Sequence, residues 1–130
     1  MSPHLRLPHI TLLAVLSCLA PAAVVVSSGA EASLVTRATR SCTPPKYPGS
    51  GYFTGKIRAR NVTCAYAKRF VVTYYKCRVR NGGIDGRCRT RVRRFKCTEV
   101  RNRIATEIDA RVTCNRGTQR IVHTYQQNIE

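Results

Sequence analysis

Five arginines between positions 87 and 94 are the residues whose type and spacing most directly indicate a binding function. Arg87, Arg89, Arg91 and Arg93 recur at every second position, and Arg94 follows directly. In an extended strand or arm this spacing places four guanidinium groups along one face. A guanidinium group is a planar, permanently charged donor that suits phosphate and carboxylate groups. The sequence therefore predicts a polyanion-binding surface made of Arg87, Arg89, Arg91, Arg93 and Arg94.

The net charge of the chain points the same way. The chain has 23 Lys and Arg against 6 Asp and Glu, which gives a formal net charge of +17. Such a field attracts polyanions, so the expected partner is a cell-wall polymer, an acidic glycan, a nucleic acid or an anionic lipid surface. Two alternatives stay open: the charge reflects a biased arginine usage, or it only keeps an exported domain in solution. No zinc-finger spacing and no RNA-recognition aromatic motif is present.

A small ribonuclease-like hydrolase is the enzymatic alternative. Glu107, Arg111, His123 and Tyr125 are residue types that such enzymes combine on a sheet. General acid–base catalysis requires the carboxylate and the imidazole on one face, and the sequence does not place them there. We therefore expect no enzymatic activity, no catalytic residues and no cofactor. We also expect no metal site, because the chain has no C-x-x-C pair and only His123 lies beyond the first 32 residues.

Residues 1–32 have the pattern of a signal peptide. Arg6 precedes an uncharged apolar run over 10–26, and Ala30 and Ala32 suit a signal peptidase, with cleavage after Ala32 or after Ala30. A permanent membrane anchor and lipid attachment at Cys18 are the alternatives. The expectation is a monomer that is secreted, extracellular or associated with the cell envelope, with no transmembrane segment in its mature chain.

Of the 7 cysteines, Cys18 lies in the predicted signal peptide and the other six belong to the exported part. In a small exported chain an even number of cysteines indicates disulfides, here three. Cys77 and Cys88 flank a glycine-rich loop, so we expect them to be bonded. Spacing leaves the other pairs open, and the expected topology favours Cys64–Cys97 and Cys42–Cys114, with Cys64–Cys114 as the main competitor. The six structural cysteines are Cys42, Cys64, Cys77, Cys88, Cys97 and Cys114.

The predicted architecture is an α+β fold with one helix packed on a small antiparallel sheet. Thr63 is a good N-cap, and apolar residues recur at steps of three and four from Cys64 to Tyr74, which predicts a helix within 61–77. Prolines in 33–50 predict an extended N-terminal arm pinned by Cys42. Residues 51–130 form the predicted disulfide-rich domain, with strands over 51–62, in the alternating stretch from Arg87 that leads to Cys97, over 107–114 and over 118–126.

Four short motifs give a resemblance to a known group. They are Val-Thr-Cys-Ala-Tyr-Ala at 62–67, Phe-Lys-Cys at 95–97, Val-Thr-Cys-Asn-Arg-Gly at 112–117 and Ile-Val-His-Thr-Tyr at 121–125. This pattern resembles small exported single-domain proteins common in actinobacteria, which have a Cys-x-x-Ala helix start and a Val-x-Cys-x-x-Gly hairpin. The resemblance implies a disulfide-stapled fold and export, and it implies no activity. Cys42 and the pair Cys77 and Cys88 depart from the simplest members.

A protein-interaction or inhibitor module is the third functional class. The loop over 78–87 lies between Cys77 and Cys88. A disulfide-held loop loses little conformational entropy when it docks, and inhibitors exploit this. Binding that survives high salt would favour a packed protein interface, whereas binding to a polyanion fades as salt rises.

Overall fold

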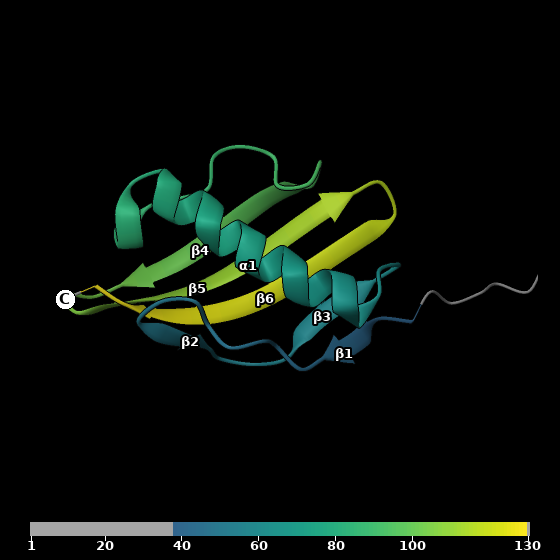
Figure 1. The fold of residues 1–130 in the computed structure, drawn as a ribbon, viewed down its shortest axis with the longest axis horizontal. Coiled ribbons are helices and arrows are strands. Elements are labelled where there is room, and N and C mark those ends of the chain that lie inside the picture. The colour runs from purple at the N-terminus through teal and green to yellow at the C-terminus, as the bar shows by residue number, and fades with distance from the viewer. Residues whose placement is uncertain (1–37, 130) are drawn as a thin grey trace, which may run out of the picture. The chain divides into compact units, whose positions relative to one another are not determined.

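The structure is a computed structural model that describes residues 38–129 (Figure 1). The predicted signal peptide and the first residues of the predicted arm lie outside the described residues. The described part contains one long helix, one short 3-10 turn and six strands in a single antiparallel sheet, so the predicted α+β fold is confirmed. The elements are β1 (Arg40–Cys42), β2 (Gly51–Phe53), β3 (Ile57–Arg60), α1 (Cys64–Arg80), η1 (Gly83–Asp85), β4 (Lys96–Arg103), β5 (Glu107–Arg116) and β6 (Gln119–Asn128).

The helix α1 begins where its capping residue predicts. The Thr63 hydroxyl accepts a hydrogen bond of 3.2 Å from the backbone N–H of Tyr66, which satisfies one free donor of the first turn. The helix runs to Arg80, beyond the predicted range, and the Asn81 side chain then donates a 2.6 Å hydrogen bond to the carbonyl oxygen of Cys77. Its buried stripe comprises Ala67, Phe70, Val71, Tyr74, Cys77 and Arg78.

The sheet has the strand order β1-β3-β6-β5-β4. The strands β2 and β3 lie along the same edge of β6, with Phe53 paired to Tyr125 and Arg58 paired to Val122. The single strand predicted over 51–62 is therefore two short strands with a break between them. Part of the predicted arm is also built into the sheet, because β1 pairs with β3.

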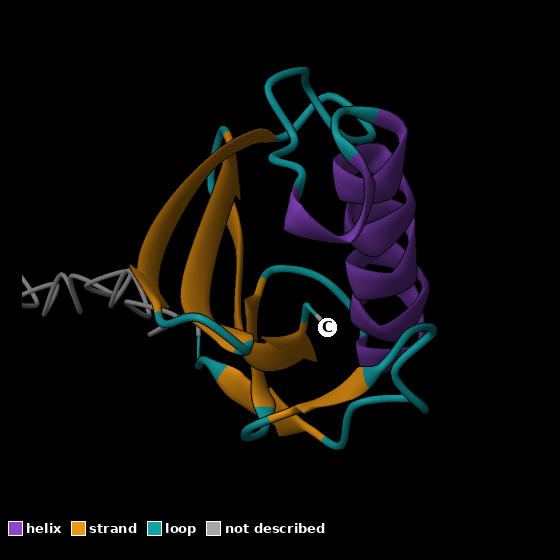
Figure 2. Cartoon of the chain, turned by 90° about the vertical axis from the view of Figure 1, so that its left-hand side faces the viewer, coloured by secondary structure: helices purple, strands orange, loops and turns teal. Residues whose placement is uncertain are grey.

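The two faces of the sheet have different surroundings (Figure 2). The inner face packs under α1 and carries the buried residues of the long hairpin: Ile108, Ala110, Val112, Cys114, Ile121, His123, Tyr125 and Gln127. The outer face carries the alternate residues, and no described helix or strand covers it. The hairpin turns through Gly117 and Thr118, where Gly117 has a φ of +54° that suits the first position of a tight two-residue turn.

Three disulfides staple the domain, and one of the three predicted pairs is confirmed. Cys77 bonds to Cys88 as expected. The expected pairs Cys64–Cys97 and Cys42–Cys114 are wrong, and so is the competitor Cys64–Cys114, because the bonds are Cys42–Cys64 and Cys97–Cys114.

The sheet register explains this pairing. Cys97 and Cys114 face each other directly across β4 and β5, with their Cα atoms 4.0 Å apart. Cys42 ends β1, which lies at the edge of the sheet, and its Cα is 5.4 Å from that of Cys64 at the helix start.

Three disulfides indicate an oxidising, extracellular compartment. Within residues 38–129, no helix is both long and apolar enough to cross a membrane. The same residues hold no group of three or more His, Cys, Asp or Glu side chains that could bind a metal ion.

Candidate functional site

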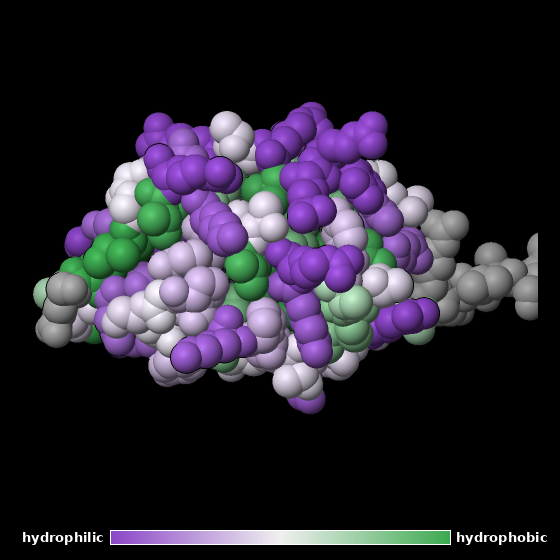
Figure 3. All heavy atoms as spheres, in the orientation of Figure 1, coloured by the Kyte–Doolittle hydropathy of each residue, from purple (hydrophilic) through white to green (hydrophobic). Residues whose placement is uncertain are grey.

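The five arginines predicted to bind polyanions lie in the segment that leads from η1 into β4. We call residues 87–94 the basic segment. All five arginine side chains are exposed, but the expected strand is absent, since residues 86–91 have no regular structure and the only pairing is an isolated bridge between Val92 and Phe95. Disulfides at Cys88 and Cys97 fix the segment at both ends. Figure 3 shows hydrophilic side chains crowded along the edge above α1, where this segment runs.

Two arginines occupy an unusual turn in this segment. The backbone groups of Val92 and Phe95 bond to each other at 3.1 Å and 2.8 Å, and the two residues between them, Arg93 and Arg94, have φ angles of 45° and 70°. Both central residues are therefore left-handed, as in a type I′ turn, where Asn-Gly is the usual pair. A left-handed residue with a side chain costs roughly 1–2 kcal/mol. The chain thus places two arginines where glycine and asparagine would be more stable.

The turn is supported from the neighbouring hairpin by Arg116. Its Nη1 donates a 3.1 Å hydrogen bond to the carbonyl oxygen of Arg93, and its guanidinium lies 4.6 Å from the ring of Phe95. A cation over an aromatic face is a favourable contact of about 0.5–2 kcal/mol. The backbone of the turn is therefore fixed while the side chains of Arg93 and Arg94 extend into solvent.

A small cleft lies between the basic segment and the start of β4. It has a volume of about 260 Å³ and is lined by Arg89, Thr90, Arg91, Lys96 and Cys97. Three cationic side chains converge here from two stretches of chain. The cleft is therefore a first place where an anionic group can be held by more than one residue.

The outer face of the sheet holds a second basic cleft, which sequence reasoning missed as a site. This outer-face groove has a volume of about 240 Å³ and is lined by Thr39, Arg58, Arg60, Arg111, Arg120 and Val122. The alternation of Arg58 and Arg60 with Ile57 and Ala59 was the available signal, since it places both arginines opposite the core. Only the strand order could bring Arg111 and Arg120 beside them.

The arginines of both clefts lack acidic partners in the described part of the chain. Over residues 38–129 the ion pairs are Arg101 with Glu99 and Arg103 with Asp85, and neither involves an arginine of either cleft. Val122, which lines the outer-face groove together with its four arginines, is only 8% exposed. The guanidinium groups are thus gathered on the surface with their charges uncompensated.

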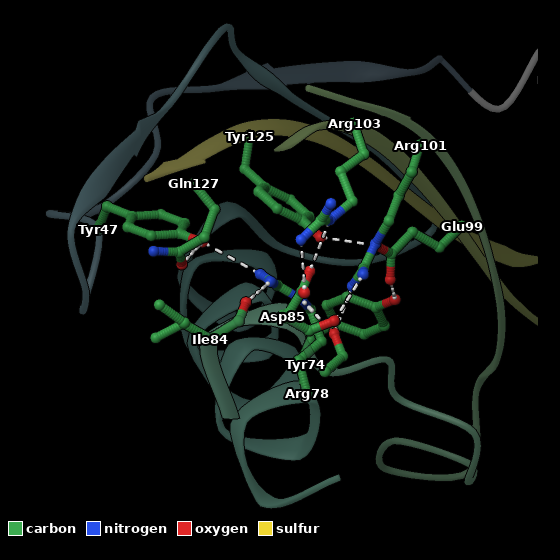
Figure 4. A network of polar contacts seen from close by, with 11 residues as sticks. Tyr47, Tyr74, Arg78, Ile84, Asp85, Glu99, Arg101, Arg103, Tyr125 and Gln127 are labelled. Atoms are coloured by element: carbon green, nitrogen blue, oxygen red, sulfur yellow. Dashed lines mark hydrogen bonds and ion pairs between the residues drawn. The ribbon is translucent and has the colours of Figure 1, made fainter. Parts of the chain in front are cut away.

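A buried polar network beneath the end of α1 holds the loop before the basic segment (Figure 4). Arg78 is 1% exposed, and it donates to the hydroxyl of Tyr47 at 3.1 Å and to the carbonyl oxygen of Ile84 at 2.9 Å. Its guanidinium also lies 4.2 Å from the ring of Tyr125. Arg101 donates to the carbonyl oxygens of Asp85 and Gly86. Two arginines therefore anchor the turn η1 to the domain.

Glu99 is the acidic centre of this network. It accepts hydrogen bonds from Tyr74 at 2.5 Å and Tyr125 at 2.6 Å, and it pairs with Arg101. Burial opposes ionisation, but the hydrogen bonds from Tyr125, Tyr74 and Arg101 outweigh it and lower the pKa of Glu99. Burial, together with the hydrogen bond to this carboxylate, raises the pKa of Tyr74. The carboxylate is thus charged and fully engaged with protein groups, which is a structural role.

The ribonuclease-like set does not assemble. Glu107 and Arg111 project from the outer face of β5, whereas His123 and Tyr125 project from the inner face of β6 beneath α1. His123 is 2% exposed, and burial lowers its pKa to about 3. The Glu107 side chain instead accepts a hydrogen bond from Gln126. No carboxylate–imidazole pair therefore faces a common substrate position among these four residues.

Comparisons with protein-family models, with curated proteins and with solved structures gave no match to this chain.

Proposed function

We propose that this is an exported cationic domain, secreted or associated with the cell envelope, that binds anionic polymers. The observation that carries the proposal is the basic segment, in which five exposed arginines have no carboxylate partner among residues 38–129. A polymer with many anionic groups releases counterions from both surfaces as it binds, which drives association. The guanidinium groups of Arg87, Arg89, Arg91, Arg93 and Arg94 are the proposed contacts.

The backbone around the segment supports this proposal. Disulfides at Cys88 and Cys97 hold the segment before any ligand arrives, so little backbone entropy is lost on binding. The left-handed pair Arg93 and Arg94 is a local cost to the fold, and such strain is concentrated at functional sites. Both features suit a surface kept ready for a ligand.

The test is retention of the oxidised protein on heparin and on immobilised nucleic acid across a salt series. The variant Arg89→Ser/Arg91→Ser/Arg93→Ser should elute at markedly lower salt than the wild type. The matched control is Lys68→Ser/Arg69→Ser/Lys76→Ser, which removes the same charge from exposed positions on α1. Equal loss in the two triple variants, or no retention of the wild type near 50 mM salt, would contradict the proposal.

A second candidate function is docking of a protein partner by the loop between Cys77 and Cys88. Ile84 is 40% exposed in this loop, and the backbone is held by Arg78 at the carbonyl oxygen of Ile84 and by Arg101 at that of Asp85. An exposed apolar side chain on a rigid loop suits a small protein interface. Binding of a protein partner that persists at high salt and is lost in Ile84→Ser would support this function. Loss of that binding in the triple arginine variant would contradict it.

A further inference from the structure

We propose that the two basic clefts are joined into one track across the outer face of the sheet, and that the track binds the backbone of a single-stranded nucleic acid. This inference rests on the proposed function and names the ligand class for it. The track begins at the cleft of Arg89, Arg91 and Lys96 and ends in the outer-face groove.

The register of the sheet sets out the path. Lys96 on β4 faces Asn115 on β5, Asn115 faces Arg120 on β6, and Arg120 faces Arg60 on β3. Residues paired across strands point to the same face, so these four side chains form one row on the outer face. Neighbouring strands lie about 4.8 Å apart, which makes the row from Lys96 to Arg60 roughly 14 Å long.

The row meets a basic cleft at each end. Lys96 lines the cleft of the basic segment, and Arg60 and Arg120 line the outer-face groove. Arg58, two residues from Arg60 on β3, and Arg111, four residues from Asn115 on β5, line the same groove to one side of the row. Cations thus continue from one edge strand, β4, over the sheet to the strand β3. A linear polyanion laid perpendicular to the strands would pass Lys96, Arg120 and Arg60, with Arg58 and Arg111 to one side.

The side chains of the track are those that contact a nucleic acid backbone. Phosphate and sugar groups are bound by Arg and Lys together with Thr, Asn and similar donors. Here Asn115 lies between two cations of the row, and Thr90 and Thr39 line the two clefts. The guanidinium groups supply paired donors for phosphate oxygens.

No aromatic residue of the described chain lines either cleft, so neither cleft offers a ring on which a base could stack. Base stacking on aromatic side chains is the usual source of base contacts in single-strand binding proteins. The linings consist of Thr, Arg, Lys, Cys and Val side chains. The track should therefore read the phosphate backbone and discriminate little between base sequences. A flexible single strand can follow a twisted sheet from one cleft to the other, whereas a stiff duplex cannot bend over so short a path.

The test uses the oxidised full chain and oligothymidylates of about 4 to 16 nucleotides, the range of sites on single-strand binding folds. Binding is measured by fluorescence anisotropy near 50 mM salt, beside an oligoadenylate and a duplex of equal length. Arg60→Gln/Arg120→Gln removes two cations from the track. The matched control Lys68→Gln/Arg69→Gln removes two from exposed positions on α1, away from the track. The unfolding midpoint of each variant shows whether it folds. If the Arg60/Arg120 double variant does not fold, Arg58→Gln/Arg111→Gln takes its place.

The expected result is that affinity rises with length and then levels off, that oligothymidylate and oligoadenylate bind alike, and that the duplex binds less tightly. The Arg60/Arg120 double variant should lose about tenfold per arginine, and the α1 double variant much less. Equal losses in the two double variants, or tighter binding of the duplex, would overturn the track while the proposed function stands. Retention on heparin without binding of any oligonucleotide would also overturn the track and leave the proposed function standing. Absence of binding to both heparin and oligonucleotide would overturn both.

Discussion

Arg60 and Arg120 face each other directly on β3 and β6, with no carboxylate of the described chain paired to either. Like charges opposite each other on a sheet are destabilising by a few tenths of a kcal/mol up to about 1 kcal/mol. Both side chains are exposed, so salt screens their repulsion. The fold retains this repulsion, and a bound anion would relieve it.

The variant Arg120→Gln should therefore be more stable than the wild type at low salt, by about 0.5 kcal/mol. Urea unfolding at low and high salt measures the difference, which should shrink as salt rises. Arg103→Gln is the control, because Arg103 has a carboxylate partner in Asp85 and its loss should not stabilise the fold. A less stable Arg120→Gln at low salt would show that the pair does not repel.

Replacing Arg93 and Arg94 in the left-handed turn should make the fold more stable and weaken its binding to polyanions. Arg93→Asn/Arg94→Gly supplies the residues that a type I′ turn favours, and it should raise the free energy of unfolding by about 1–2 kcal/mol. The same change removes two proposed contacts, so retention on heparin should fall. Thermal unfolding and a salt elution series measure the two effects. A loss of stability would contradict the strained turn, and unchanged retention would place the contacts elsewhere.

His123 predicts a loss of stability in acid. Burial lowers the pKa of His123 from its ordinary value of 6.5 to about 3, against the attraction of Glu99 and with a smaller contribution from Arg78. Between these values the unfolded chain binds the proton and the folded chain does not. The neutral His123 therefore causes no loss in the free energy of unfolding above pH 6.5. As the pH drops from 6.5 toward 3, the free energy of unfolding falls by at most about 1.4 kcal/mol per pH unit.

The check on this prediction is His123→Leu, which removes the titrating group. The free energy of unfolding of the wild type should fall between pH 6.5 and 4 by about 2–3 kcal/mol more than that of the variant. Tyr74 and Phe53 contact the imidazole ring edge to face, so an apolar replacement suits the site. Parallel pH profiles for the two proteins would contradict a neutral buried histidine.

The bond between Cys42 and Cys64 ties the edge strand β1 to the start of α1. It closes a loop with a sequence separation of 22, so its removal should cost about 3 kcal/mol in the chain-entropy account. Cys42→Ala/Cys64→Ala should show this loss in urea unfolding and faster amide exchange in β1. Peptide mapping of the oxidised protein should recover Cys42 linked to Cys64. A Cys64–Cys97 peptide would contradict the pairing.

Local signals in the sequence predicted the elements they govern. Thr63 and the apolar stripe predicted the helix because capping and periodicity act within a few residues. The turn residues before Gln119 predicted the last hairpin, and the glycine-rich loop predicted the bond between Cys77 and Cys88. Each of these features depends on neighbours in the chain.

Features that depend on distant residues were missed or predicted wrongly. The bond Cys97–Cys114 follows from the register of β4 on β5, and the outer-face groove requires β3, β5 and β6 side by side. The alternating arginines predicted an extended strand or arm with four guanidinium groups on one face, but the chain reverses at Arg93 and Arg94 before it enters β4. Arg78 is buried because Tyr47 and the loop at Ile84 supply its partners, and no local pattern marks it.

The salt dependence of binding to a single phosphodiester polymer, poly(U), tests the central claim most directly. We predict that the logarithm of the association constant falls linearly with the logarithm of the salt concentration. Each phosphate that the protein neutralises should contribute about −0.7 to the slope, and several phosphates should be neutralised. The Arg89→Ser/Arg91→Ser/Arg93→Ser variant should have a slope shallower by about two units. Absence of binding near 50 mM salt, or one slope shared by wild type and variant, would contradict the account.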